Sequence, residues 1–244
     1  IHSHTDTNEL RRSRLTFTRL LGNLLSSCRS YLDHAPHYLG QLDGEQAEVF
    51  LARTREAYDA ELGYRFMEAL RNHAQHRGSP LHGTSFNSRW VERDSEDTFL
   101  QYSVGASVNV DDLRADRKFK RSILKDFAED ERIDVLAMAR IYIEKLGQLH
   151  SQCRDDTSSL MERNKRLLRS ALDRYQRETG ESRIGVAIAR SNNDRTVQSF
   201  DHLPEDVIDW YESLVKRNRN VVNLRKRFVS NELLPERKGS PRGI

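Results

Sequence analysis

The chain begins with a regular spacing of apolar side chains. From Asn8 to Leu32 the apolar residues recur at intervals of three, four or seven: Leu10, Phe17, Leu21, Leu24, Cys28 and Tyr31. This spacing places them on one face of an α-helix. Pro36 is predicted to interrupt the helix, because proline disfavours helical geometry at the residue before it. The segment from His37 to Leu42 is therefore predicted to be a connector.

A second helical pattern follows directly. Asp43 is expected to cap its first turn, with Gln46 three residues later in a variant of the capping box. The apolar face then continues until Gly78 and Pro80, which are typical of a helix stop. We expect one helix from about Glu45 to Arg77, antiparallel to the first helix in a long hairpin.

The pattern changes to one typical of β-structure after Gly78. Gly, Ser, Pro and Asn accumulate between Ser79 and Asp97, which predicts an exposed loop. Thr98–Val104 and Ser107–Val110 are rich in β-branched and aromatic residues on either side of Gly105, which predicts a short β-hairpin.

Helical spacing resumes near Asp116 and continues to Leu172 as one very long helix or two. Asp155 to Ser158 is a possible break with a new cap, so both interpretations stay open. A second hairpin is predicted from Ile184–Ala189 and Thr196–Phe200, and a last helix from Pro204 to about Val229.

These patterns predict a mainly α protein: a helical bundle with long antiparallel helices and two small β-hairpin insertions. Five segments are expected in chain order. They are an N-terminal helical hairpin (1–83), a loop and β-hairpin insertion (84–115), long helices that complete the bundle (116–180), a β-hairpin with a basic C-terminal helix (181–234) and a disordered tail (235–244).

Composition excludes several classes of protein. A bilayer span needs ~20 apolar residues, and the best uncharged apolar run, Ile184–Ala189, is far shorter. No membrane association is therefore expected. Cys28 and Cys153 are distant in sequence, which favours a reducing, cytoplasmic location. No HExxH motif or zinc-type His/Cys spacing is present, so neither a metal nor a cofactor is expected. Lys and Arg number 40 against 37 Asp and Glu, so any nucleic-acid site depends on a local patch.

The candidate chemistry lies at the end of the second predicted helix. Arg71 is followed by Asn72 and, after four intervening residues, by His76. Similar spacing occurs at Arg29/His34, Arg77/His82 and Arg195/His202. Only Arg71 follows a sustained amphipathic helix and precedes a Gly/Pro stop, so Arg71/His76 ranks first and Arg29/His34 second.

This arrangement resembles the HEPN family (higher eukaryotes and prokaryotes nucleotide-binding domain), whose mark is an Arg, usually a polar residue, and a His four to six residues further on. The resemblance covers Asn8 to Gly83 in detail, and the helical segment after Asp116 fits loosely. It implies a metal-independent endoribonuclease that acts as a homodimer, in a toxin or antiphage-defence setting with a possible antitoxin or defence-system partner protein. By resemblance Arg71, Asn72 and His76 are the catalytic residues.

Helix geometry qualifies how these side chains act together. Five residues correspond to ~140° around a helix, so Arg71 and His76 lie on different faces, whereas Asn72 and His76 share one. The long arginine side chain and a loosened last turn would still allow both groups to reach one phosphate. An imidazole can move the proton of a 2′-OH, and a guanidinium can stabilise the phosphorane. RNA would be cut to a 2′,3′-cyclic phosphate and a 5′-OH, whereas DNA would be inert.

A second predicted RNA contact lies near the C-terminus. Between Lys216 and Arg242, nine basic residues face two acidic ones, and the candidates for RNA binding are Lys216, Arg217, Arg225, Lys226 and Arg227. A solvated helix face explains the same charges. Two alternatives to an enzyme remain: a non-catalytic HEPN-like module that binds RNA or nucleotide, and a helical protein-interaction subunit. In both, the helix dipole alone accounts for Arg71 and His76, and His73 is a core or boundary histidine.

Overall fold

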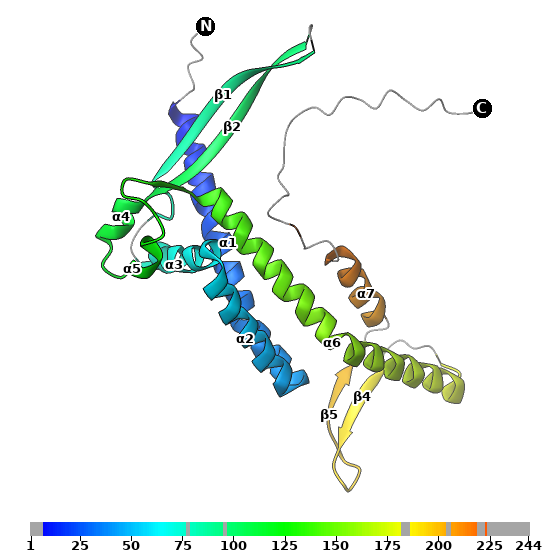
Figure 1. The fold of residues 1–244 in the computed structure, drawn as a ribbon. Helices are drawn as coiled ribbons and strands as arrows, with labels where there is room; N and C mark the ends of the chain where they lie inside the picture. Colours follow the sequence, from blue (N-terminus) through cyan, green and yellow to red (C-terminus); the bar gives the residue numbers. More distant parts are fainter. Residues whose placement is uncertain are drawn as a thin grey trace, which may run out of the picture.

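The computed structural model describes residues 7–76, 79–94, 97–181, 186–203, 206–218 and 223. Within them the chain forms mostly helices, together with two small antiparallel sheets (Figure 1), which confirms the predicted mainly α fold with β-hairpin insertions. The elements in chain order are α1 (Thr7–Leu42), α2 (Gly44–Ala60), α3 (Leu62–His76), β1 (Gly83–Asp94), β2 (Asp97–Asn109), α4 (Val110–Ala115), α5 (Arg121–Leu124), β3 (Arg132–Asp134), α6 (Val135–Thr179), β4 (Ala187–Ser191), β5 (Val197–His202) and α7 (Val207–Asn218).

The first helix continues through its proline. α1 contains Pro36 and ends only at Leu42, so the predicted interruption and the connector over 37–42 are wrong. Proline removes one backbone hydrogen bond but can be accommodated inside a helix when packing compensates. Leu39, in the turn after Pro36, is buried in the core and holds that last turn in place.

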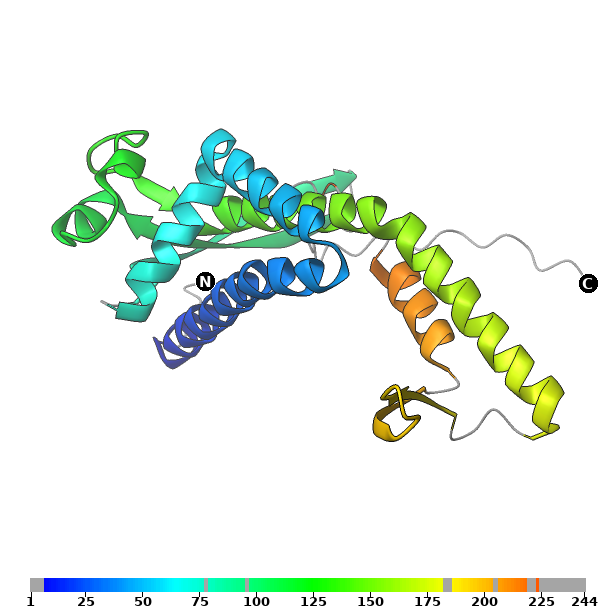
Figure 2. The same ribbon diagram turned by 90° about the horizontal axis from the view of Figure 1, so that it is seen from below.

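The predicted second helix is two helices. Glu61 has extended backbone angles (φ −118°, ψ 114°) and separates α2 from α3, so the single helix over 45–77 is wrong. The predicted cap is confirmed, because the Asp43 carboxylate accepts a hydrogen bond from the Glu45 backbone N–H at 3.0 Å. At the other end of α2, Arg65 donates to the carbonyls of Tyr58 (3.2 Å) and Asp59 (2.5 Å), which satisfies helix-terminal acceptors. α2 lies antiparallel against α1, whereas α3 runs at an angle to both and contacts each of them (Figures 1 and 2).

The first sheet has the strand order β1-β2-β3, with antiparallel pairing throughout. The loop predicted over 79–97 and the hairpin turn predicted at Gly105 are wrong, because Gly105 lies inside the β1–β2 ladder opposite Ser85. A glycine fits there for a steric reason: a Cβ on Gly105 would lie 2.5 Å from the Ser85 hydroxyl oxygen. The long β1–β2 hairpin extends past the helices (Figure 1), and its base packs on α4 and α6.

The open question about the third helical segment is resolved in favour of one helix, but its predicted start near Asp116 is wrong, because residues 116–134 form turns, the short α5 and β3. α6 runs unbroken for 45 residues from a cap at Asp134 to Gly180, whose positive φ of 70° ends it. Thr157 and Ser158 do not break it, because their hydroxyls donate back to the carbonyls of Cys153 and Asp155. The predicted second hairpin is confirmed as β4–β5, and α7 begins close to its predicted start and is described to Asn218.

The hydrophobic core lies around α3. It gathers α1, α2, α3, the α4–α5 segment, β2, β3 and the first half of α6, with Phe66, Met67, Leu70, Val108 and Tyr142 almost fully buried. α7 lies along the outer half of α6 (Figures 1 and 2), where Glu212 pairs with Lys165 and Arg169, and the β4–β5 hairpin is exposed at every residue. No helix in the described parts of the chain is long and apolar enough to cross a bilayer.

The contact between α3 and α6 is predicted to be sensitive to a single methyl group. A Cβ on buried Gly63 would lie 2.8 Å from two side-chain carbons of Ile141, so Gly63→Ala should lower the free energy of unfolding by about 1–3 kcal/mol. Gly22→Ala is the matched control, because nothing lies within 4 Å of a Cβ at that helical position, and it should add about 0.5–1 kcal/mol. Urea unfolding followed by circular dichroism measures both, and equal effects would contradict this close packing.

His150 is predicted to make stability depend on pH. It lies between α1 and α6, 3.3 Å from the Tyr31 hydroxyl, and burial, with a smaller effect of Arg154, lowers its pKa below the ordinary 6.5. Below pH 6.5 the unfolded chain therefore binds the proton more readily, and the free energy of unfolding should fall as the pH falls. The free energy of unfolding, measured at pH 5.5 and 7.5, should differ less between the two pH values in His150→Gln than in the wild type. The exposed His37→Gln should keep the wild-type difference, and a His150→Gln difference equal to that of the wild type would contradict the assignment.

Candidate functional site

The C-terminal half of α3 borders a hollow of about 420 Å³, here called the α3–α5 hollow. Four of its residues lie on one face of α3, at spacings of three and four: Ala69, Asn72, His73 and His76. Asn72 and His76 are exposed at its rim. The predicted shared face of Asn72 and His76 is thus present, and both side chains border the same space.

The opposite wall is the segment between α4 and α5. Asp116 shapes it as a tight turn, because its carboxylate accepts from the backbone N–H of Lys118 at 3.0 Å. Lys118, Phe119 and Lys120 complete the lining of the hollow. Phe119 is buried, whereas the ammonium of Lys120 donates to the Tyr58 hydroxyl at 2.7 Å and lies 4.9 Å from the centre of that ring. Lys118 and Lys120 therefore line the same hollow as the two histidines, with the Lys120 ammonium bonded to Tyr58.

Arg71 does not line the hollow itself. Its guanidinium reaches the site through Asn72, whose amide oxygen accepts from Nη1 at 3.1 Å. The Nε–H group of Arg71 is buried and lacks a hydrogen-bond partner, the one such side-chain atom in the described part of the chain. A buried N–H without a partner is costly, so this donor is ready for an acceptor that the protein does not supply.

His73, which lines the hollow, also contacts a histidine outside it, His82. His73 Nδ1 is 2.9 Å from Asp116 Oδ2, and the two side chains are only 9% and 10% exposed. The His73 ring meets the rings of Phe119 and His82 edge-on, each at 6.2 Å between centroids. Burial lowers the pKa of His82, and Asp112 at 3.0 Å from its Nδ1 offsets part of that effect. The aromatic neighbours hold the His73 ring in a fixed orientation.

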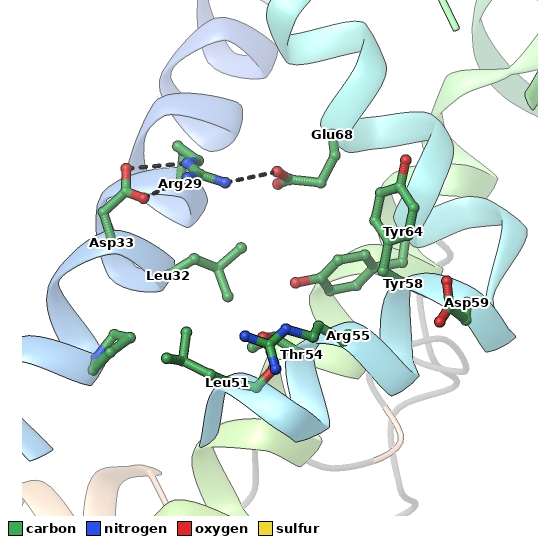
Figure 3. A pocket seen from close by; sticks show the side chains of 11 residues that line it. Arg29, Leu32, Asp33, Leu51, Thr54, Arg55, Tyr58, Asp59, Tyr64 and Glu68 are labelled. Atoms are coloured by element: carbon green, nitrogen blue, oxygen red, sulfur yellow. Dashed lines mark hydrogen bonds and ion pairs between the residues drawn. The ribbon is translucent and has the colours of Figure 1, made fainter. Parts of the chain in front are cut away.

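The alternative arginine, Arg29, lines a different hollow, which Figure 3 shows. This α1–α3 hollow of about 600 Å³ is lined by Arg29, Leu32, Asp33, Pro36, Leu51, Thr54, Arg55, Tyr58, Asp59, Tyr64 and Glu68. The Arg29 guanidinium pairs with Asp33 at 2.5 Å and with Glu68 at 3.2 Å. Glu68 also accepts a hydrogen bond from the Tyr142 hydroxyl. His34 is exposed and does not line this hollow. Arg29 is thus held in an ion-pair network without a histidine.

Among the predicted basic residues near the C-terminus, the two that the structure describes, Lys216 and Arg217, lie away from both hollows. Lys216 and Arg217 are exposed in the last turn of α7, which lies beside the outer half of α6 (Figure 1). Arg225, Lys226 and Arg227 lie outside the described residues. The structure therefore does not bring Lys216 or Arg217 to His76.

Sequence reasoning missed half of the α3–α5 hollow. The sequence marks Asp116 only as the point where helical spacing resumes, and it predicts no role for Lys118 or Lys120. The available signal was the basic run over 117–121 directly after an aspartate, a composition typical of an anion-binding turn. Nothing in the sequence, however, indicates that this run packs against the last turns of α3.

Comparison with known proteins gives no relative from which a function could be inferred, so the residues of the two hollows carry the functional inference. The chain matches no protein-family model, no curated protein and no solved structure. Among the described residues, no three His, Cys, Asp or Glu side chains gather as metal ligands.

The Arg29 network is predicted to stabilise the fold. Arg29→Ala should lower the free energy of unfolding by about 1–3 kcal/mol, because Glu68, only 15% exposed, loses its cationic partner. Adding Glu68→Gln to this variant should recover part of the loss, since the uncompensated charge is removed. Urea unfolding of the two single variants and the double variant measures the coupling. Strictly additive effects would show that the pair contributes nothing.

Proposed function

We propose that this protein is a metal-independent endoribonuclease of the HEPN type, with its active site at the α3–α5 hollow. The observation that carries the proposal is the meeting of Asn72 and His76 with Lys118 and Lys120 around one hollow. Ammonium groups attract a phosphate, an imidazole can transfer protons, and an amide can orient the substrate. The resemblance of the Arg71–His76 segment to the HEPN motif adds the reaction class.

The proposed reaction needs only the RNA and these side chains. His76 takes the proton of the 2′-hydroxyl as its oxygen attacks the adjacent phosphorus, the bond from phosphorus to the 5′-oxygen breaks, and the released 5′-oxygen takes up a proton. Lys118 and Lys120 hold the phosphate, and their charges offset the negative charge that grows on it. The products are a 2′,3′-cyclic phosphate and a 5′-hydroxyl end.

Arg71 acts in this proposal as the ligand of the phosphate in the transition state. Its contact with Asn72 places the guanidinium at the edge of the hollow, and its unpartnered Nε–H gains an acceptor when the side chain turns toward a phosphate oxygen. Asn72 then orients the Arg71 guanidinium relative to His76.

The resemblance also supplies the assembly and the setting of the proposal. Two copies pair as a homodimer, as the resemblance implies. The proposed substrate is RNA. The proposed setting is a toxin or antiphage-defence role in the cytoplasm, with a neighbouring antitoxin or defence protein as partner. Lys216 and Arg217, exposed on α7, would contact the RNA backbone away from the cleaved bond.

RNA cleavage in the presence of EDTA tests the proposal. The wild-type protein should cut a mixed-sequence RNA to cyclic-phosphate ends and leave the matching DNA intact. His76→Ala should lower the rate by about 10²–10⁴-fold and Arg71→Ala by about 10²–10³-fold, because each removes one transition-state contribution. His34→Ala is the matched control, since His34 lies outside both hollows, and it should cut at the wild-type rate.

The other outcomes identify the alternatives. RNA binding without cleavage would indicate a binding module, and neither binding nor cleavage would indicate a protein-interaction subunit. Cleavage lost in His34→Ala but kept in His76→Ala would assign the reaction to the Arg29 side of α3.

A further inference from the structure

His73 lies one turn before His76 on the same face of α3, and both line the α3–α5 hollow. Unlike His76, which is exposed, His73 is largely enclosed and has a fixed partner: Asp116 Oδ2 lies 2.9 Å from its Nδ1. A carboxylate that accepts from Nδ1–H orients the ring, and in the imidazolium form the other nitrogen, Nε2, carries the proton that a general acid donates to a substrate.

Cleavage by a 2′-hydroxyl involves two proton transfers at different places. One proton leaves the attacking 2′-oxygen, and another is needed on the 5′-oxygen as its bond to phosphorus breaks. The two oxygens lie on opposite sides of the phosphorus in an in-line reaction. Two proton-transfer groups in one hollow, one for each side, suit this geometry better than one.

We propose that His73 is the general acid of the reaction and that Asp116 is its positioning residue, an inference that depends on the function proposed above. His76 takes the proton from the 2′-hydroxyl, and the 2′-oxygen forms its bond to phosphorus. The phosphorus–O5′ bond breaks, and its electron pair takes the proton that His73 carries on Nε2. Water-mediated exchange then returns both imidazoles to their starting states, so protons and electrons balance.

The surroundings of His73 hold charges of both signs. Asp116 faces it from the α4–α5 segment, together with Lys118 and Lys120, and His76 faces it from α3 itself. On the far side the His82 ring meets it edge-on; Asp112 lies against His82, and Arg14 donates to the His82 carbonyl. The second Asp116 oxygen is held by the Lys118 backbone, so the carboxylate cannot turn away freely.

A pair of substrates separates an acid from a merely structural histidine. Ordinary RNA has a 5′-alkoxide leaving group that needs a proton, whereas uridine 3′-(p-nitrophenyl phosphate) releases a phenolate that does not. His73→Gln should lower kcat on RNA by about 10²–10³-fold and leave kcat on the nitrophenyl ester within about threefold of the wild type. His76→Ala should lose activity on both substrates, because the attacking 2′-hydroxyl is the same.

Asp116→Asn provides the second variant, since it keeps the size and one acceptor oxygen of the side chain. It should lower kcat on RNA by about tenfold, spare the ester and move the pH profile of kcat on RNA, because the charge beside His73 is gone. Exposed His37→Gln is the matched control and should cut both substrates normally. Circular dichroism melting curves show that each variant is folded.

The two proposals fail in distinguishable ways. A wild-type protein that cuts neither substrate overturns the ribonuclease and with it the role of His73. An active wild type with inactive His76→Ala but fully active His73→Gln overturns only the present inference. Equal losses on RNA and ester in both folded variants, His73→Gln and Asp116→Asn, would also overturn it.

Discussion

The placement of α3 is the constraint on which the rest of the structure depends. The helix is short and breaks from α2 at Glu61, and it is buried among α1, α6 and the α4–α5 segment. Gly63 brings its backbone against Ile141 of α6 with no room for a methyl group. Glu68 then fixes its rotation, because its carboxylate bonds both Arg29 of α1 and Tyr142 of α6. Close packing and a partly buried charge together fix both the position and the rotation of α3.

The two sides of α3 differ in chemistry as a result. On the Glu68 side, burial and that carboxylate raise the pKa of Tyr64 and Tyr142, and raise the pKa of Cys28 to about 11. These groups stay protonated at neutral pH, and Arg29 is occupied by ion pairs, so this side holds the fold together. On the other side lie two histidines and two lysines, and Arg71 reaches their edge only through its bond to Asn72. The groups suited to proton transfer and anion binding are thus gathered on one side only.

Local signals predicted the elements better than their limits. Apolar spacing identified α1 and α6, and Asp43 identified the start of α2, because these features act within a few residues. The continuation of α1 past Pro36 depends on the burial of Leu39. The break between α2 and α3 at Glu61 depends on the packing of Gly63 against Ile141. Neither contact is visible in the sequence. The same holds for the site. Helical spacing placed Asn72 and His76 on one face, but the approach of the basic turn at 116–120 is tertiary.

A helix C-terminus is an unusual place for an anion, and this explains the composition of the hollow. The last carbonyls of α3 carry a partial negative charge, which by itself repels a phosphate and favours cations. Histidines in that turn suit the local field, but a phosphate would enter only if further positive charge outweighs the carbonyls and Asp116. Lys118 and Lys120 supply that charge from the opposite wall, and the Arg71 guanidinium lies at the edge. The balance therefore depends on bringing the α4–α5 segment to α3, which the buried Phe119 and the His73–Asp116 bond accomplish.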